Sequence, residues 1–474
     1  MTKSTDVRVT GSAVYFLPVR TRVPLKFGGE TLVSVICARA RVWVTDRKGR
    51  TAEGWGETPL SVQWAWPGQT SIEHREQILK QFCARLAGDW ARQAAFGHPL
   101  ELGADFAEHV LPDALAQANH GLGIEGGIPW LAALICCSLY DIALHDAYGN
   151  LHGRPVYETY GPEFMNRSLG DFMTPAEGRK NTFLGLYPQD ILPREKPPEL
   201  YAWHLVGGLD LLNASELKGE EPDDGYPVVL TDWIRQDQLK CLKVKLRGND
   251  ASWDFQRVQR VGQIAVSSGV DWLSADFNCT VSDPNYVNAI LDRVREEQPR
   301  IYGMILYVEQ PFPYDLKANQ IDVHSVSARK PLFLDESAHD WRMLKLGRSL
   351  GWNGVALKTC KTQTGAILSA CWAKTHGMGV MVQDLTNPML AQIPHVLLAA
   401  RVGTLFGVET NSMQFYPEAS AIESRIHPGL YRRRNGKVNL ATLDGPGFGY
   451  RLNEMQRPLP APHAEFGDSQ RVTA

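Results

Sequence analysis

The sequence lacks the features that mark several large classes of protein. Its 49 lysine and arginine residues and 52 aspartate and glutamate residues leave a formal net charge of −3, so no basic excess points to nucleic acid or to an anionic membrane. Residues 1–6 have no apolar core of the kind found in a signal peptide. The longest apolar stretch, around Trp130–Leu144, is interrupted by Ser138 and Asp141, which predicts a buried helix rather than a membrane span.

Cysteine is present without any recognisable pattern. The eight cysteines are scattered, Cys136 and Cys137 are adjacent, and no pair has the CxxC spacing. This distribution argues against a zinc cluster and favours reduced, buried thiols in a cytoplasmic protein. We therefore expect a cytoplasmic protein whose partners include neither nucleic acid nor membrane.

The N-terminal third has the pattern of an α+β domain. Runs rich in valine, isoleucine and aromatic residues predict strands at Val7–Val19, Leu32–Val44 and Ala52–Glu57. The polar segment Arg20–Glu30 between the first two is interpreted as a loop. Helical spacing follows, and Ile128–Tyr148 is predicted to be a strongly apolar helix. Strands followed by helices indicate a domain separate from the remainder of the chain.

From residue 201 onward, strand and helix patterns alternate regularly. This alternation predicts a parallel sheet with helical crossovers, and eight strands would close a barrel. The predicted strands are Tyr201–Leu205, Cys241–Lys245, Val270–Asn278, Met304–Phe312, Pro331–Asp335, Gly354–Cys360, Gly379–Leu385 and Thr404–Asn411.

The same patterns suggest how the chain divides. We expect an α+β domain in residues 1–160 and a (β/α) barrel in residues 161–411, with a long irregular excursion near residues 162–200. Residues 412–474 lack the alternation and are expected to return to the N-terminal domain.

Five successive barrel strands end in charged residues, at intervals of about 30 residues as expected for βα units. The strand ends of a parallel barrel are where catalytic groups sit. Lys243 and Lys245 share a face because alternate residues of a strand point the same way, and lysine inside a barrel is costly unless it is paired or functional. An inward ion-pair network without catalysis is the alternative. The five strand ends carry Lys243 and Lys245, Asp276, Glu309, Asp335, and Lys358.

Three of these groups have the chemistry of a divalent-metal site. Asp276, Glu309 and Asp335 come from consecutive strands, and carboxylates that lie so close repel one another unless a cation lies between them. Oxygen ligands without histidine or cysteine suit Mg²⁺ or Mn²⁺ and argue against zinc. Glu336 competes for the third position, but alternation puts Asp335 on the face of Phe333 and points Glu336 away.

Two lysines flank this group. Lys358 lies on the strand after Asp335, which places it across the barrel mouth from Lys245. Lysines that face each other over a metal suggest acid and base chemistry on the two faces of one carbon. A lysine Schiff-base enzyme is a further possibility, but it would not need three carboxylates.

At these residues the chain resembles the enolase superfamily, in particular the muconate-lactonizing-enzyme subgroup of the mandelate racemase/muconate-lactonizing enzyme family. The barrel motifs that carry the resemblance are Lys243-Val-Lys245, Asp276-Phe-Asn278, Glu309-Gln-Pro311, Asp335-Glu-Ser337 and Lys358. Outside the barrel, similar motifs are Gly54-Trp-Gly-Glu57, the segment Asp141–Gly149 with Gly153-Arg-Pro155, and Asp444–Gly449.

The resemblance implies a fold and a cofactor. The fold would be an α/β protein with a modified (β/α) TIM-type barrel and an N-terminal α+β capping domain completed by the C-terminal tail. The cofactor would be Mg²⁺, with Mn²⁺ possible, bound by Asp276, Glu309 and Asp335. The partner would be a small-molecule carboxylate that loses its α-proton to give a metal-stabilised enediolate, and a homo-oligomer is expected.

The resemblance also implies roles for individual residues. Lys245 and Lys358 would be the catalytic acid/base pair, and Lys243 would help to neutralise the enolate oxygen. Glu409 would bind the substrate carboxylate or else be a satisfied strand-end carboxylate. Asp384, at the position where mandelate-racemase-like members carry histidine, would contact the substrate, so a His–Asp dyad is not expected.

The reaction within this family stays open at the level of sequence. Paired lysines permit racemisation or epimerisation, which we favour, but also a cycloisomerase or an acid dehydratase, so the chain is expected to be an isomerase or a lyase. An inactive metal-binding barrel is the alternative from another class. Arg20–Glu30 and Val62–Gly68 are expected to set specificity, and Trp64 and Trp66 either close over the site or pack within the cap.

Overall fold

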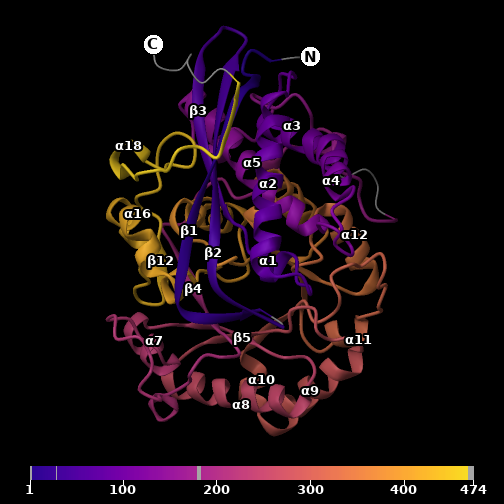
Figure 1. The fold of residues 1–474 in the computed structure, drawn as a ribbon. Helices are drawn as coiled ribbons and strands as arrows, with labels where there is room; N and C mark the ends of the chain where they lie inside the picture. The colour runs from indigo at the N-terminus through magenta and orange to yellow at the C-terminus, as the bar shows by residue number, and fades with distance from the viewer. Residues whose placement is uncertain (1–2, 28, 179–182, 468–474) are drawn as a thin grey trace.

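The computed structural model describes residues 3–27, 29–178 and 183–467. It consists of a (β/α) barrel beneath a cap of antiparallel sheet and helices, and the described part of the chain begins and ends in the cap (Figure 1). The predicted fold class is therefore confirmed. The boundaries predicted for the three segments stay predictions.

All eight predicted barrel strands are present in a sheet that follows the order of the chain. From β4 to β10 each strand pairs in parallel with the next, and β11 pairs in parallel with β4. Between β10 and β11 the ring is joined by a hydrogen bond from Leu405 N to Val380 O of 2.8 Å. The strands are β4 Glu199–Val206, β5 Cys241–Lys245, β6 Trp272–Asp276, β7 Ile305–Glu309, β8 Leu332–Leu334, β9 Gly354–Leu357, β10 Gly379–Val382 and β11 Val408–Glu409.

Helices connect these strands on the outside of the barrel. Their bounds are α7 Leu230–Asp237, α8 Ala251–Ser268, α9 Pro284–Glu297, α10 Pro299–Met304, α11 His324–Ser327, α12 Trp341–Leu350, α13 Gln363–Thr375 and α14 Gln392–Val402. The described part of the excursion after residue 162 holds the 3₁₀ helix Leu169–Asp171 and the short helix α6, Pro188–Ile191. The tail holds α15 Ser412–Phe415, α16 Ala421–Ile426, α17 Pro428–Tyr431, β12 Lys437–Asn439 and α18 Leu452–Met455, and β12 pairs with β4.

The barrel interior changes from apolar to charged along the strands. A buried layer fills its base, made of Trp203, Cys241, Tyr307, Phe333 and Met381. Because side chains two positions apart point the same way, the next inward layer carries the charged residues Lys243, Glu309 and Asp335. The apolar base thus closes one end of the barrel and leaves the charges at the other.

The cap sheet has the order β13-β1-β2-β3, and β13 (Ala464–Gly467) brings the tail back to the N-terminal strands as predicted. The prediction that Arg20–Glu30 is a loop is wrong. β1 runs from Val7 to Phe27 and β2 from Glu30 to Asp46, so the two form one long hairpin that reaches down to the barrel (Figure 1). Its polar residues are explained by docking, since Arg22 forms a two-pronged ion pair with Asp224 at 2.6 and 2.8 Å.

The helices of the cap pack on one side of this sheet. They are α1 Val62–Ala65, α2 Ile72–Ala91, α3 Pro99–Asp105, α4 Leu111–Asn119 and α5 Trp130–His152. Among the described residues α5 alone is long and apolar enough to cross a membrane, but 94% of its most apolar window is buried inside the protein. The prediction of a buried helix in this region is therefore confirmed.

The helix α5 lies unusually close to β3 (Thr51–Pro59). A Cβ atom added to Gly56 would stand 2.1 Å from Leu139 O, and one added to Gly54 would stand 2.1 Å from Ala147 N. Only glycine permits this approach of backbone to backbone. The glycines of the motif Gly54-Trp-Gly-Glu57 are thus explained by packing.

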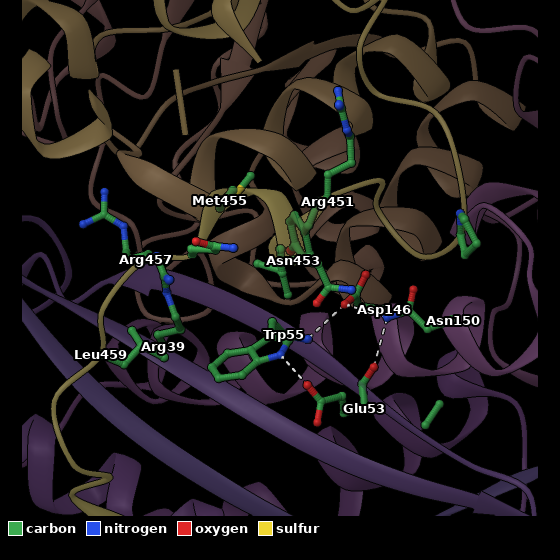
Figure 2. Close-up of a pocket in the computed structure, with 15 residues that line it drawn as sticks. Arg39, Glu53, Trp55, Asp146, Asn150, Arg451, Asn453, Met455, Arg457 and Leu459 are labelled. Atoms are coloured by element: carbon green, nitrogen blue, oxygen red, sulfur yellow. Dashed lines mark hydrogen bonds between the residues drawn. The ribbon is translucent and has the colours of Figure 1, made fainter. Parts of the chain in front are cut away.

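The three cap motifs named above meet at one carboxylate. Asp146 of α5 accepts hydrogen bonds from Trp55 N at 3.0 Å and from Phe448 N at 2.9 Å. Figure 2 shows this junction beside a cavity of about 590 Å³ between the cap sheet and the tail. Nearer the start of α5, Asp141 accepts hydrogen bonds from the backbone N and the hydroxyl of Thr364 at 2.9 and 2.7 Å. These bonds fix the cap to α13 of the barrel.

We predict that Gly56→Ala lowers the free energy of unfolding by about 3 kcal/mol or more, because the added methyl group must push α5 away from β3. Urea denaturation at neutral pH measures this change. Gly303→Ala is the matched control, since a Cβ there meets nothing within 4 Å and alanine favours the helix α10. Equal stability of the two variants would contradict the close approach of α5.

Candidate active site

The mouth of the barrel is organised around Lys243. Its Nζ lies 2.7 Å from Glu309 Oε1, 3.0 Å from Asp276 Oδ2 and 3.2 Å from Glu409 Oε2. All four side chains are buried. Burial alone would lower the pKa of Lys243, but the charges of Asp276, Glu309 and Glu409 outweigh it and hold the pKa well above its usual range. Lys243 is therefore the cation that three strand ends share.

The predicted pair Lys245 and Lys358 is anchored on two different carboxylates. Lys245 Nζ bonds to Asp276 Oδ2 at 2.5 Å. Lys358 Nζ lies 3.1 Å from Asp335 Oδ2 and donates to the backbone carbonyl of Asp384 at 2.9 Å. β5, which carries Lys245, and β9, which precedes Lys358, are four strands apart in the ring of eight, so the two lysines come from opposite sides of the mouth.

A fourth lysine, which the sequence analysis missed, completes this cluster. Lys361 Nζ bonds to the backbone carbonyl of Asp335 and lies 3.2 Å from its Oδ1. Burial would raise the pKa of Asp335, but Lys358 and Lys361 outweigh burial and hold the pKa below its usual range. Lys361 lies in the 3₁₀ turn Thr359–Lys361 rather than in a strand, so no alternation pointed to it. Its place three residues after Lys358 was the only signal.

Glu309 is the least compensated carboxylate of the group. Oε1 accepts from Lys243, whereas Oε2 is buried and has no hydrogen-bond partner among the described residues. Burial raises the pKa of Glu309 well above its usual range, and repulsion from Asp276 and Asp335 adds to this effect against the opposing charge of Lys243. An orphaned buried carboxylate oxygen is the kind of atom that a bound cation satisfies.

Glu336, the competitor of Asp335, faces the cap. Its Oε1 accepts from Trp64 Nε1 at 2.8 Å and from Asn278 Nδ2 at 3.1 Å. The ring of Trp64 also faces two ammonium groups. The Nζ atoms of Lys358 and Lys361 are 4.8 and 5.7 Å from the ring centroid. Of the two roles considered for Trp64, contact with the barrel mouth is therefore what its position supports.

The side chains of the two remaining candidates, Glu409 and Asp384, are held by hydrogen bonds to neighbouring residues. Glu409 Oε2 accepts from Lys243 and from Asp384 N, and Oε1 accepts from Asn411 Nδ2 at 2.7 Å. The carboxylate of Asp384 accepts from the backbone and side chain of Asn387 and from Asn411 N. Asp384 reaches the lysine cluster through its backbone carbonyl, which accepts a hydrogen bond from Lys358 Nζ. These contacts suit residues that position Lys243 and Lys358.

The donor set suits a hard cation, although the carboxylates now face lysines. In the part of the chain that the structure describes, no group of three or more histidine, cysteine, aspartate or glutamate side chains is arranged to hold a metal ion. Lys243 Nζ instead lies between Asp276 and Glu309, within 3.0 Å of one oxygen of each. The orphaned Oε2 of Glu309 and the all-oxygen donor set still fit a cation such as Mg²⁺.

We predict that Lys243→Met lowers the free energy of unfolding by about 3–5 kcal/mol in buffer with chelator, because it leaves buried carboxylates without their shared counter-ion. Urea denaturation checks this value. Lys240→Met, at the entrance to the same strand, removes an ammonium whose bond is to the carbonyl of Gly269 and should change stability by less than about 0.5 kcal/mol. A loss below about 1 kcal/mol for Lys243→Met would contradict the central role of this lysine.

Comparison with known proteins supports the resemblance described above. Residues 229–456 match the family model described as "Enolase C-terminal domain-like". No curated protein matches the sequence significantly.

Several solved structures share the whole architecture at low sequence identity. An N-succinyl Arg/Lys racemase from Bacillus cereus has a TM-score of 0.60 at 15% identity, over 97% of this chain and 99% of that one. A dipeptide epimerase from Enterococcus faecalis, complexed with Mg and a dipeptide, has a TM-score of 0.59 at 14% identity, over 93% and 99%. A 2-chloromuconate cycloisomerase from Rhodococcus opacus has a TM-score of 0.56 at 17% identity, over 95% and 100%.

The lysines and carboxylates of the barrel mouth lie within the matched residues, whereas the first barrel strand, β4, precedes them, and the cap and tail are shared with the solved structures. Residues 229–456 are therefore similar to the enolase C-terminal domain-like family, and the whole chain has the fold of solved mandelate racemase/muconate lactonizing proteins.

Proposed function

We propose that this protein removes the α-proton of a small-molecule carboxylate with the help of Mg²⁺, and that it returns a proton to the opposite face in a racemisation or epimerisation. The observation that carries this proposal is the placement of Lys245 and Lys358. They come from opposite sides of the barrel mouth and each is bonded to a different carboxylate. Two ammonium groups so placed can serve one carbon from both faces.

The metal would be held by Asp276, Glu309 and Asp335, and Mn²⁺ would suit the same oxygen atoms. When bound, the ion supplies positive charge where the substrate carboxylate becomes more negative as its α-proton leaves. Glu309 supports this assignment with its buried, unpartnered Oε2. Asp335 is preferred over Glu336 because its carboxylate faces the lysine cluster, whereas Glu336 is bonded to the cap through Trp64.

The remaining residues of the mouth would hold these groups in place. Lys243 lies centrally and offers its ammonium to the developing negative charge. Glu409 orients Lys243, and the backbone carbonyl of Asp384 fixes the Nζ of Lys358. The cap residue Trp64 covers the lysines and keeps water from the reacting carbon.

N-acylated amino acids and dipeptides are the first substrates to test. The solved structures with similar folds include a racemase of N-succinyl Arg/Lys and epimerases of dipeptides. Each of these compounds carries a carboxylate next to the exchangeable carbon. The same machinery with one active base would instead serve a cycloisomerase or a dehydratase.

We predict that Mg²⁺ raises the thermal stability of this protein, because a ligand that binds only the folded state stabilises it by about 2.7 kcal/mol at one hundred times its Kd. Calorimetry with and without chelator measures the shift. Asp276→Asn should abolish most of it, since it removes a ligand charge.

Asp283→Asn is the matched control for this experiment. Asp283 caps α9 through Asn285 N, a role that asparagine also fills, so its magnesium-dependent shift should equal that of the parent. An Asp276→Asn variant that binds Mg²⁺ as tightly as the parent would show that the ligands are wrongly assigned.

The two lysines should differ in stereochemistry. In deuterated water, Lys245→Ala should still exchange the α-proton of one enantiomer of a substrate, and Lys358→Ala that of the other. Net racemisation should fall by about 10²–10⁴-fold in both variants, because each removes one general acid/base group. Proton NMR of the α-position follows both quantities, and Lys240→Ala serves as a control that should behave as the parent.

Other outcomes lead to different reactions. Full racemisation by Lys358→Ala would rule out the two-base mechanism. Loss of exchange from both enantiomers in one variant, with only weaker binding in the other, would indicate one-base chemistry and a cycloisomerase or dehydratase. Absence of exchange with every carboxylate offered to the parent enzyme would favour an inactive metal-binding barrel.

A further inference from the structure

A second cavity begins at the edge of the lysine and carboxylate cluster. It has a volume of about 330 Å³ and lies between the cap and the ends of β6, β7 and β8. Its cap side includes Gly29, the turn of the β1–β2 hairpin, and the segment Gln63–Pro67. Its barrel side includes Asn278 and Glu336, and Asn278 N donates to Asp276 Oδ1 at 2.9 Å. The cavity is therefore next to the proposed metal site.

The lining of this cavity combines aromatic rings with negative charge. Trp64, Trp66 and Tyr314 supply the rings, and Glu125 and Glu336 supply the charges. None of the described residues that line it is a lysine, an arginine or a histidine. Lys358 and Lys361 contact the ring of Trp64 but are bonded to Asp335 and do not line the cavity. Aromatic faces beside carboxylates are the surroundings that a bound cation prefers.

Glu336 brings a buried carboxylate to the lining of this cavity. The side chain is 4% exposed, and Trp64 Nε1 and Asn278 Nδ2 hold its Oε1 in place. Among the described residues, no N–H or O–H group donates to its Oε2, and the nearby donor is the weak S–H group of Cys279, which also lines the cavity. A buried carboxylate with so weak a donor is costly, so its place in the lining of a cavity points to a stronger donor that enters from outside the protein.

The cap side of the cavity is held rigidly. The buried Arg75 bonds to the backbone carbonyl of Trp66 and, at 3.0 Å, to Glu30 Oε2. The other oxygen of Glu30 accepts from Gly68 N at 2.9 Å. These bonds join the hairpin to the segment after α1, so the cavity is formed before any ligand binds, which lowers the cost of binding.

We propose that this cavity takes the positively charged end of the substrate's side chain, an ammonium or a guanidinium group, and that Glu336 pairs with it. This inference deepens the proposed function and rests on it for the location of the reacting carbon. Trp64 and Trp66 stack against the cation, and the exposed Glu125 attracts it at the rim. Specificity for a cationic substrate then comes from the cap and from β8 together.

The test compares two ligands that differ in charge but hardly in shape, Nα-acetyl-L-arginine and Nα-acetyl-L-citrulline. Isothermal titration in buffer with Mg²⁺ should show at least about tenfold tighter binding of the arginine compound, as expected for a charged hydrogen bond in a buried site. Glu336→Gln keeps the acceptor for Trp64 and Asn278 and should reduce the preference to about threefold or less. Glu125→Gln, an exposed change that leaves the fold intact, should reduce it partly.

Glu220→Gln is the matched control, since Glu220 is exposed and lines a different cavity. It should retain the full preference. Equal binding of the two ligands by the parent protein, or an unchanged preference in Glu336→Gln, would overturn the assignment. So would a loss of Mg²⁺ affinity in Glu336→Gln as large as that of Asp276→Asn, because Glu336 would then be a metal ligand.

Exchange of the α-proton in deuterated water, measured on the same two compounds, separates this inference from the proposed function. A binding preference for the arginine compound without exchange of any carboxylate would leave the cavity assignment standing and reject the function. Exchange of both compounds with equal binding would do the reverse.

Discussion

Charge compensation at the barrel mouth is the constraint on which the rest of the structure depends. Five carboxylates and four ammonium groups are buried there, and a single unpaired charge in such a place costs several kcal/mol. Each lysine is therefore bonded to a carboxylate, and the apolar layer of Trp203, Tyr307 and Phe333 closes the barrel beneath them. The charged groups are Asp276, Glu309, Asp335, Glu336 and Glu409, with Lys243, Lys245, Lys358 and Lys361.

The cap satisfies the same constraint from above. Trp64 donates to Glu336 and its ring faces the ammonium groups of two lysines, so the cap provides part of the environment that the charges need. Its position relative to the barrel is fixed by the bonds from Thr364 to Asp141, and the glycines of β3 let α5 come close enough to make them. The motifs outside the barrel are thus structural supports of a site that none of them touches.

The sequence predicted the parts of this protein that follow from periodicity. All eight barrel strands and the inward direction of Lys243, Glu309 and Asp335 follow from alternation, because a strand has a fixed period of two. Lys361 lies in a turn, which alternation does not reach. The polar residues around Arg22 predict a loop because their partner Asp224 is 202 positions away in the sequence. The bond between Trp64 and Glu336 likewise depends on tertiary contacts that no local pattern contains.

The stability of this charge network and its chemistry require different states of the same lysine. Burial alone would lower the pKa of Lys358, but Asp335 outweighs burial and holds the pKa above its usual range, so Lys358 carries its proton while this contact persists. In the proposed reaction it would accept a proton from the substrate only after the contact with Asp335 is given up. The carboxylates that stabilise the folded barrel would then need another positive partner. A metal-binding role for Asp335 would reconcile a stable fold with a lysine base.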